Sequence, residues 1–255
     1  RLRSRGLGDV YKRQDKDRAE GEAMDISHGA SFAGPMKIYA GGYEDVGDAA
    51  IIVITAGANQ KPNETRLDLV QKNAKIMTDV VTQIKEQEYK GILLIVSNPV
   101  DIMTQVAMEV SGFPEHRVFG SGTVLDSARL RYHLGQHLGV DSRSVHAFVI
   151  GEHGDSEIAA WSSANVSGVP LNSFCEMRGH YNHEGNTESI EEQVKNSAYE
   201  IIAKKDATYY GIAMVVKRIC QAIVRDEKSI FPISLRMHGE YALEDVVLSL
   251  SLIHI

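Results

Sequence analysis

One short stretch of the sequence combines residue types that can move a proton near neutral pH. It reads GEHGDSE, spans residues 151–157, and follows an apolar, strand-like segment over residues 145–150. Its glycines allow tight turns and the close approach of a ligand. His153 is therefore predicted to stand on an exposed loop among carboxylates, where imidazole can exchange protons. On these seven residues alone, a polar loop that carries a histidine by chance is the alternative interpretation.

A second pair of charged residues is predicted to share one face of a helix. The pattern indicates a helix that Thr123 caps and that runs to about Leu138. Asp126 and Arg129 stand three residues apart on it, so their side chains are neighbours. An exposed ion pair of this kind contributes little to stability. The apolar residues that flank the pair instead indicate a partly buried setting.

The elements that must position these groups begin with a predicted parallel sheet. Residues 49–55 and 92–96 are almost continuously apolar, as expected for strands buried on both faces. Between them, residues 67–84 place apolar side chains every three or four positions, which predicts a long helix and hence a βαβ unit. Such sheets bind ligands at the carboxyl ends of their strands, where residues 57–58 and 97–98 stand.

The rest of the chain adds shorter elements. Helices are expected over residues 18–28, 101–111 and 190–225, the last broken near 206–208; strands over 37–40, 118–120, 230–235 and 246–248; and loops over 162–186. The fold class is therefore α/β, with an incomplete doubly wound parallel (Rossmann-type) sheet domain followed by an α+β substrate domain. We expect a partial dinucleotide-binding domain over residues 15–122 and a substrate and catalytic domain over 123–250. Residues 1–14 and 251–255 are expected to be non-native segments, because their character differs from the rest.

Composition and charge exclude several classes of function. A net charge of −7, without a basic stripe, argues against a nucleic-acid partner. No apolar run reaches the length of a membrane span, so no membrane partner is expected. The two cysteines form no CxxC motif, which argues against a disulfide framework. His180 and His183 form an HxxH pair, but no third ligand stands nearby, and no metal site is predicted. A cytoplasmic location follows by default.

Five motifs in order carry a family resemblance. They are ITAGA at 54–58, QKP with ETRL at 60–67, SNPVD at 97–101, LDSARL at 125–130 and GEHGDSE at 151–157. Together they resemble bacterial-type L-lactate dehydrogenases of the lactate/malate dehydrogenase family, over about residues 15–250. The resemblance implies an oxidoreductase that interconverts L-lactate and pyruvate by hydride transfer to or from NAD, with a role in glycolysis and fermentation.

The resemblance also assigns catalytic roles. His153 corresponds to the proton donor and acceptor, and Asp126 to the carboxylate that orients its ring and favours imidazolium. Arg66 lies beside a loop that closes over the substrate in the family, and it is expected to polarise the reacting carbonyl. Arg129 corresponds to the guanidinium that binds the substrate carboxylate in bidentate geometry.

Three further positions are implied to bind substrate. Asn98 is expected to contact both substrate and nicotinamide, and Thr208 matches a position beside the substrate. Gln60 bears on specificity, because the malate branch has arginine there to pair with a second carboxylate. A neutral glutamine would leave that charge unpaired and dehydrated, so it favours pyruvate.

The cofactor side of the resemblance is incomplete. The expected contacts with NAD are made by Tyr43, Gly57, Ala58, Val96, Asn98 and Ser121. The family's first strand, its glycine fingerprint and its ribose-binding acidic residue should precede Asp15, so the chain is expected to be truncated at both ends. A catalytically inactive fragment therefore stands as one alternative to a lactate dehydrogenase, and a malate dehydrogenase as the other.

Regulation and assembly rest on the resemblance alone. Arg131 and His146, with Arg143 nearby, resemble an allosteric anion site for fructose 1,6-bisphosphate. The alternative is that Arg131 packs as a helix-surface residue and His146 faces another strand. The family commonly forms tetramers, so a homo-oligomer is expected. Asn63 and Asp206 stand where relatives often have glycine, and both departures are expected to affect kinetics rather than chemistry.

Overall fold

A computed structural model describes residues 16–32, 36–58 and 65–254 of the chain. The expectations for residues 1–14, Gln60 and Asn63 therefore lie outside the described residues, as does the side chain of Arg66. The chain divides into two compact units, residues 1–120 and 121–255. In the described part, no helix has the length and apolar character needed to cross a lipid bilayer.

The first unit is built on three parallel strands, as the sequence predicts. β1 (Ile51–Ile54) pairs with β2 (Ile92–Ile95), and β2 pairs with β3 (Val118–Gly120), both in parallel register. Side chains of β2 and β3 are almost completely buried, as expected for apolar strands covered on both faces. The expected strand at residues 37–40 is wrong, because only Ala40 forms a single bridge, and a strand needs continuous pairing with a neighbour.

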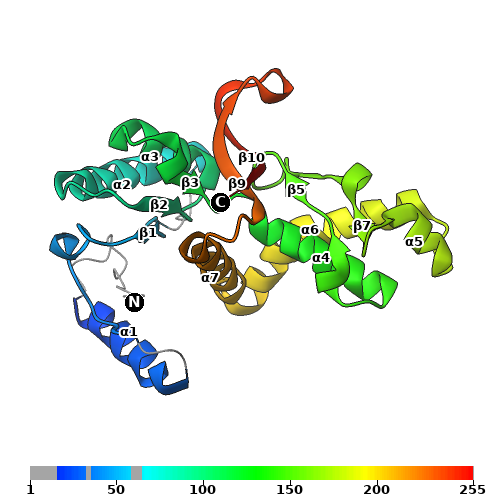
Figure 1. The fold of residues 1–255 in the computed structure, drawn as a ribbon, viewed down its shortest axis with the longest axis horizontal. Helices are drawn as coiled ribbons and strands as arrows, with labels where there is room; N and C mark the ends of the chain where they lie inside the picture. Colours follow the sequence, from blue (N-terminus) through cyan, green and yellow to red (C-terminus); the bar gives the residue numbers. More distant parts are fainter. Residues whose placement is uncertain (1–15, 33–35, 59–64, 255) are drawn as a thin grey trace. The chain divides into compact units, whose positions relative to one another are not determined.

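Two helices of the first unit pack against each other and α3 packs on the strands (Figure 1). α2 (Arg66–Glu86) begins at a capping box, in which Thr65 accepts from the backbone of Asp68 and the Asp68 carboxylate accepts from the backbone of Thr65. Met77, Val81 and Ile84 of the predicted apolar face are buried. α3 (Val100–Ser111) ends at a left-handed Gly112, a common helix stop.

The amino-terminal part of the first unit has a different character. α1 (Lys16–His28) is the helix expected at residues 18–28, but none of its residues is buried. Short 3-10 turns follow at η2 (Ala30–Phe32) and η3 (Tyr43–Asp45), and a third, η4 (Glu115–Arg117), directly precedes β3 at the other end of the unit.

α4 (Val124–Leu138) organises the core of the second unit. Its residues Leu130, Leu134 and Leu138 belong to one buried cluster that also includes side chains from the following strands and from α5 and α6. Thr123 precedes the helix as expected, but the expected side-chain cap is wrong. The Thr123 hydroxyl instead donates to the carbonyl of Val149 at 2.5 Å, which ties the helix start to the strand before the histidine loop.

The segment 145–150 forms two short strands rather than one. β4 (Val145–His146) pairs with β7 (Asn165–Val166), whereas β5 (Val149–Ile150) pairs with β6 (Ile158–Ala159). The chain changes sheets between them, because each piece satisfies its backbone groups with a different neighbour. The loops expected over 162–186 are also partly wrong, since the segment folds into a small hairpin and a helix. Its elements are η6 (Trp161–Ser163), β7, β8 (Val169–Pro170) and α5 (Leu171–Met177), and η5 (Ser142–Ser144) precedes β4.

The carboxyl-terminal half of the second unit has two long helices and a hairpin. α6 (His183–Lys205) and α7 (Tyr210–Arg225) are separated at the break expected near residues 206–208, and both contact α4. β9 (Ile230–His238) pairs antiparallel with β10 (Glu244–His254) across η7 (Glu240–Ala242). The pairing continues through residues 251–254, so the backbone of the expected tail extends this hairpin.

Candidate active site

The histidine loop of the second unit is held at both ends by backbone pairing. β5 and β6 flank the loop, and Gly151 forms an antiparallel bridge with Ser249, with both N–H···O distances at 2.9 Å. Gly151 and Gly154 have φ angles of 94° and 136°, values that side chains other than glycine rarely tolerate. These two glycines let the chain reverse tightly enough to present His153 toward α4.

His153 and Asp126, which the family resemblance pairs, form a short contact. Asp126 Oδ2 lies 2.6 Å from His153 Nδ1, and the Asp126 side chain is 2% exposed. Burial alone would raise the pKa of Asp126, but the hydrogen bond and charge of His153, together with Arg129, hold it below its ordinary value. An ionised Asp126 fixes the proton of the ring on Nδ1, so exchange with a substrate falls to Nε2.

Arg129 joins the same cluster from one turn along α4. Its Nη1 donates to Asp126 Oδ1 at 2.7 Å, and its side chain is only 14% exposed. The partly buried setting expected for the pair is confirmed. Arg129 also lines a groove between α4 and α6, of about 370 Å³, that includes Tyr132 and Lys204. The Arg129 guanidinium is therefore fixed on one side by the Asp126 carboxylate.

Glu157 is a member of this cluster that sequence reasoning did not single out. Its carboxylate Oε2 lies 4.0 Å from His153 Nδ1, and the residue is 5% exposed. Burial and the negative charge of Asp126 raise the pKa of Glu157 to about 7, against opposing contributions from His153, a Gly154 backbone hydrogen bond and Arg129. The available signal was its place at the entry to the apolar segment that begins at Ile158, where a solvated carboxylate is not expected.

The possible ligand atoms of Asp126, His153 and Glu157 lie within 4.8 Å of one another. Two carboxylates and one imidazole can in principle hold a divalent cation. Here the Arg129 guanidinium already supplies one positive charge to Asp126, and a proton on His153 supplies a second. The cluster therefore has the charge balance of a proton-transfer site.

In the first unit, the expected cofactor residues follow the carboxyl ends of β1 and β2. Gly57 and Ala58 follow β1, and Val96 and Asn98 follow β2. These strand ends share one edge of the parallel sheet, where nucleotides bind in this kind of fold. Small residues at 57 and 58 leave the backbone open to close approach, so the edge suits a dinucleotide.

A buried amide that sequence reasoning missed connects the two strand ends. Asn73 on α2 accepts a hydrogen bond from the backbone N–H of Ala58 at 2.8 Å and donates to the carbonyl of Asn98 at 2.9 Å. Asn73 is 4% exposed. Its position one helical turn before Met77, on the apolar face of α2, was the signal, because a polar residue there requires buried partners.

Three other expected site residues make none of the hydrogen bonds described above. Tyr43 is buried in η3 of the first unit, and Ser121 is buried at the start of the second. Thr208 is half-buried in the short connection between α6 and α7. Asp206, just before it, has a φ of 67°, a left-handed value that accounts for a glycine preference at that position.

The three residues of the expected effector site have separate partners. Arg131 donates to the carbonyl of Ser127 at 3.3 Å, and burial lowers its pKa. Arg143 is exposed and makes two hydrogen bonds with the Asp141 carboxylate, at 3.0 and 2.8 Å. His146 is exposed on β4. Over the described residues, the structure records no hydrogen bond or ion pair among these three side chains.

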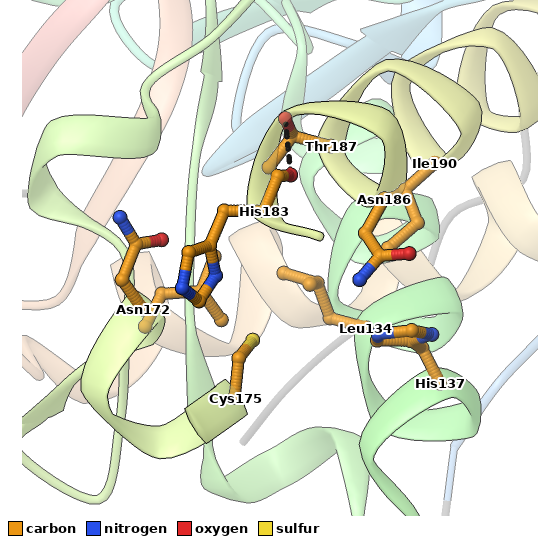
Figure 2. A pocket seen from close by; sticks show the side chains of 9 residues that line it. Leu134, His137, Asn172, Cys175, His183, Asn186, Thr187 and Ile190 are labelled. Carbon is orange, nitrogen blue, oxygen red and sulfur yellow. Dashed lines mark hydrogen bonds between the residues drawn. The ribbon is translucent and has the colours of Figure 1, made fainter. Parts of the chain in front are cut away.

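One histidine of the HxxH pair, His183, lines a small pocket between α4, α5 and α6. Figure 2 shows His183 beside Cys175, with His137 across the pocket. His183 Nε2 contacts the Glu176 carboxylate at 3.1 Å, whereas the ring of His180 lies 4.3 Å from that of His137. The two histidines of the motif thus have different partners. Both cysteines are free thiols.

Comparison with known proteins identifies the family. Residues 3–120 match the lactate/malate dehydrogenase NAD binding domain, and residues 123–253 match the lactate/malate dehydrogenase alpha/beta C-terminal domain. The L-lactate dehydrogenase of Acetivibrio thermocellus is 50% identical over 232 residues, which cover 91% of this chain and 73% of that protein. The L-lactate dehydrogenase of Thermoanaerobacter pseudethanolicus is 51% identical over 236 residues, covering 92% and 76%.

Solved structures agree with the sequence comparison. A lactate dehydrogenase from a Medee basin deep-sea metagenome library superposes with a TM-score of 0.88 at 49% identity, over 92% of this chain and 74% of that one. The minor L-lactate dehydrogenase of Enterococcus mundtii in its ligand-bound form gives a TM-score of 0.87 at 44% identity, over 91% and 74%. The chain belongs to the lactate/malate dehydrogenase family.

Proposed function

We propose that the protein interconverts L-lactate and pyruvate with NAD as cofactor. The observation that carries this proposal is the contact of His153 Nδ1 with a buried Asp126 at 2.6 Å, in a cluster that Arg129 completes. This arrangement provides a proton donor and a cation for a carboxylate within one helix and one loop. A 2-oxo acid such as pyruvate needs both, since its carbonyl oxygen must be protonated and its carboxylate bound.

His153 and Asp126 carry out the proton transfer in this proposal. In the direction of pyruvate reduction, imidazolium donates the proton on Nε2 to the carbonyl oxygen. In lactate oxidation, the neutral imidazole takes the hydroxyl proton back at the same atom. Asp126 keeps the ring oriented and stabilises its charged form, because an ionised carboxylate lies against Nδ1.

The remaining substrate contacts are proposed from the family motifs. Arg129 binds the substrate carboxylate with the remaining N–H groups of its guanidinium, while Nη1 stays on Asp126. Arg66 polarises the carbonyl, and Asn98 and Thr208 orient the substrate. Gln60 favours the methyl group of pyruvate over a second carboxylate, because a charge beside a neutral amide loses its hydration without gaining an ion pair.

When bound, NADH supplies the hydride and NAD⁺ accepts it. The chain's own contribution is to hold the cofactor at the carboxyl edge of β1 and β2. We propose contacts from Tyr43, Gly57, Ala58, Val96, Asn98 and Ser121. Asn73 supports them indirectly, because it fixes the loops that carry Ala58 and Asn98 through two backbone hydrogen bonds.

We also propose an effector site, an assembly and a cellular location for this protein. A fructose 1,6-bisphosphate site would require Arg143 to leave Asp141 and join Arg131 and His146. A homotetramer would be the assembly in which such a site operates. The two free thiols are compatible with a cytoplasmic location, where cysteines stay reduced.

The test is a comparison of NADH oxidation with pyruvate and with oxaloacetate, with His153→Ala as the inactive control. We expect a strong preference for pyruvate. Gln60→Arg should reverse the preference, because guanidinium pairs with the second carboxylate of oxaloacetate. A wild-type preference for oxaloacetate would place the protein in the malate branch, and no turnover by the folded protein with either acid would favour a binding role without catalysis.

A further inference from the structure

Glu157 occupies an unusual place for a carboxylate. It stands at the end of the histidine loop, immediately before β6, and is 5% exposed. Its backbone N–H donates to the carbonyl of Gly154 at 3.1 Å, so the loop closes on itself there. Glu152 in the same loop gives the contrast, because its exposed carboxylate accepts a hydrogen bond from the Ser156 hydroxyl at 2.6 Å. The loop can thus hold a carboxylate in solvent, as at Glu152, so the burial of Glu157 requires a separate explanation.

The contacts of Glu157 are directed at the reacting histidine. Its Oε2 lies 4.0 Å from His153 Nδ1, the same atom that contacts Asp126 at 2.6 Å. Two buried carboxylates therefore face one side of a single imidazole. Among the described residues, the charged groups that act on Glu157 are Asp126 and Arg129 from α4 and His153 from its own loop.

The balance of charge in this cluster changes during the reaction. With His153 protonated, two positive groups (imidazolium and Arg129) offset two carboxylates. When imidazolium gives its proton to the carbonyl oxygen, the described side chains of the cluster carry one more negative than positive charge in a buried place, which is costly. Glu157 is the carboxyl group that can take up a proton from solvent to remove it, because burial and Asp126 raise its pKa to about 7.

We propose that Glu157 is a positioning residue for His153, a second buried carboxylate that favours the imidazolium form and takes up a proton when the imidazolium loses its own. The proposal rests on the proposed function, since it concerns the same histidine. No bond other than those to protons changes, and no electrons move. The ionised Glu157 is expected to extend proton donation toward higher pH, at a cost in stability.

The decisive variant is Glu157→Gln, which keeps the size of the side chain and removes its charge. Its matched control is Glu152→Gln, which removes an exposed carboxylate from the same loop. We would measure kcat/KM for pyruvate reduction from pH 5 to 9 for both variants and the wild type. In Glu157→Gln the alkaline limb of the profile should move to lower pH by about one unit, because imidazolium loses a nearby opposite charge. The Glu152→Gln profile should coincide with that of the wild type.

Two further results complete the test. Glu157→Asp retains a charge, so its alkaline limb should return toward the wild-type position. Glu157→Gln should also unfold at a higher temperature than the wild type at pH 8, because it removes a buried charge. A Glu157→Gln profile that coincides with the wild-type profile would overturn the proposal. An alkaline limb that moves equally in Glu157→Asp and Glu157→Gln would also overturn the proposal, because the effect would then come from the changed side-chain shape and not from the charge.

A readout independent of turnover separates this proposal from the proposed function. An NMR titration of the His153 ring, assigned by its absence in His153→Ala, reports its protonation whether or not pyruvate is reduced. A lower apparent pKa of the ring in Glu157→Gln supports the role of Glu157 even if the substrate assignment fails. An unchanged ring titration refutes that role even if pyruvate is the substrate.

Discussion

The candidate residues of the two units are held by different kinds of interaction. In the first unit, small residues and backbone groups follow two parallel strands, and the neutral amide of Asn73 holds them in place. In the second unit, the Arg129 guanidinium and the His153 ring each contact the buried carboxylate of Asp126. A neutral hydrogen bond has a modest net value, whereas an unpaired buried charge is costly. Changes in the second unit should therefore have larger effects, and those effects should depend on pH.

The largest effect is expected from Asp126→Asn. The change removes the charge that stabilises imidazolium, so pyruvate reduction at neutral pH should fall by about 10²-fold or more. The pKa of Asp126 lies below its unfolded value, so the carboxylate adds stability above about pH 4, and this is lost as pH falls through the folded pKa. Denaturant unfolding at pH 3 to 6 should therefore show a weaker pH dependence in the variant.

The matched control for this prediction is Asp226→Asn. Asp226 pairs with Lys228 at 2.6 Å, but the two side chains are 75% and 68% exposed. An exposed pair should change stability by less than about 1 kcal/mol. Equal effects of the two substitutions on activity or on the pH dependence of unfolding would contradict the contrast between buried and exposed charges.

A smaller effect is expected from Asn73→Ala in the first unit. The substitution leaves the N–H of Ala58 and the carbonyl of Asn98 without the amide, which should cost about 1–3 kcal/mol of unfolding free energy. NADH affinity should weaken, while the pH profile of turnover should keep its shape. Gln83→Ala on the exposed side of the same helix is the control. A shifted pH profile in Asn73→Ala would show that the first unit also affects proton transfer, which contradicts the contrast between the units.

The smallest effect is expected at Asp206, between α6 and α7. Its φ of 67° suits glycine, so Asp206→Gly should raise the unfolding free energy by up to about 1 kcal/mol. Asp206→Ala is the control, because it removes the carboxylate from the helix end without adding backbone freedom. If alanine stabilises the protein as much as glycine does, the charge is the cause and the backbone explanation is wrong. Thermal unfolding at pH 7 distinguishes the two.

Regular periodicity made the main elements predictable from the sequence. The strands β1 and β2, the helix α2 between them and the break between α6 and α7 follow from apolar spacing and from local breakers. The single strand expected over residues 145–150 was wrong, because apolar spacing does not show which segment a strand will pair with. The choice of partner for β4 and for β5 is made by segments that follow later in the chain.

The site was predictable where its residues carry recognisable motifs. Asp126, Arg129 and His153 stand in two motifs, and the structure brings all three into contact. Glu157 and Asn73 were missed because their roles depend on burial and on distant partners. Asn73 contacts Ala58 and Asn98, 15 and 25 residues away, and no local pattern reports such pairings.

We infer that the second unit carries out proton transfer and that the first unit binds the cofactor. The most direct test of this division is a fluorescence titration of NADH into Asp126→Asn and into the wild type. The account predicts that the variant binds NADH within about twofold of the wild-type affinity, although its turnover has fallen by about 10²-fold or more. That result would assign proton transfer to the second unit and leave cofactor binding intact. A loss of NADH affinity as large as the loss of turnover would contradict the account, because the buried charge cluster would then support binding rather than catalysis.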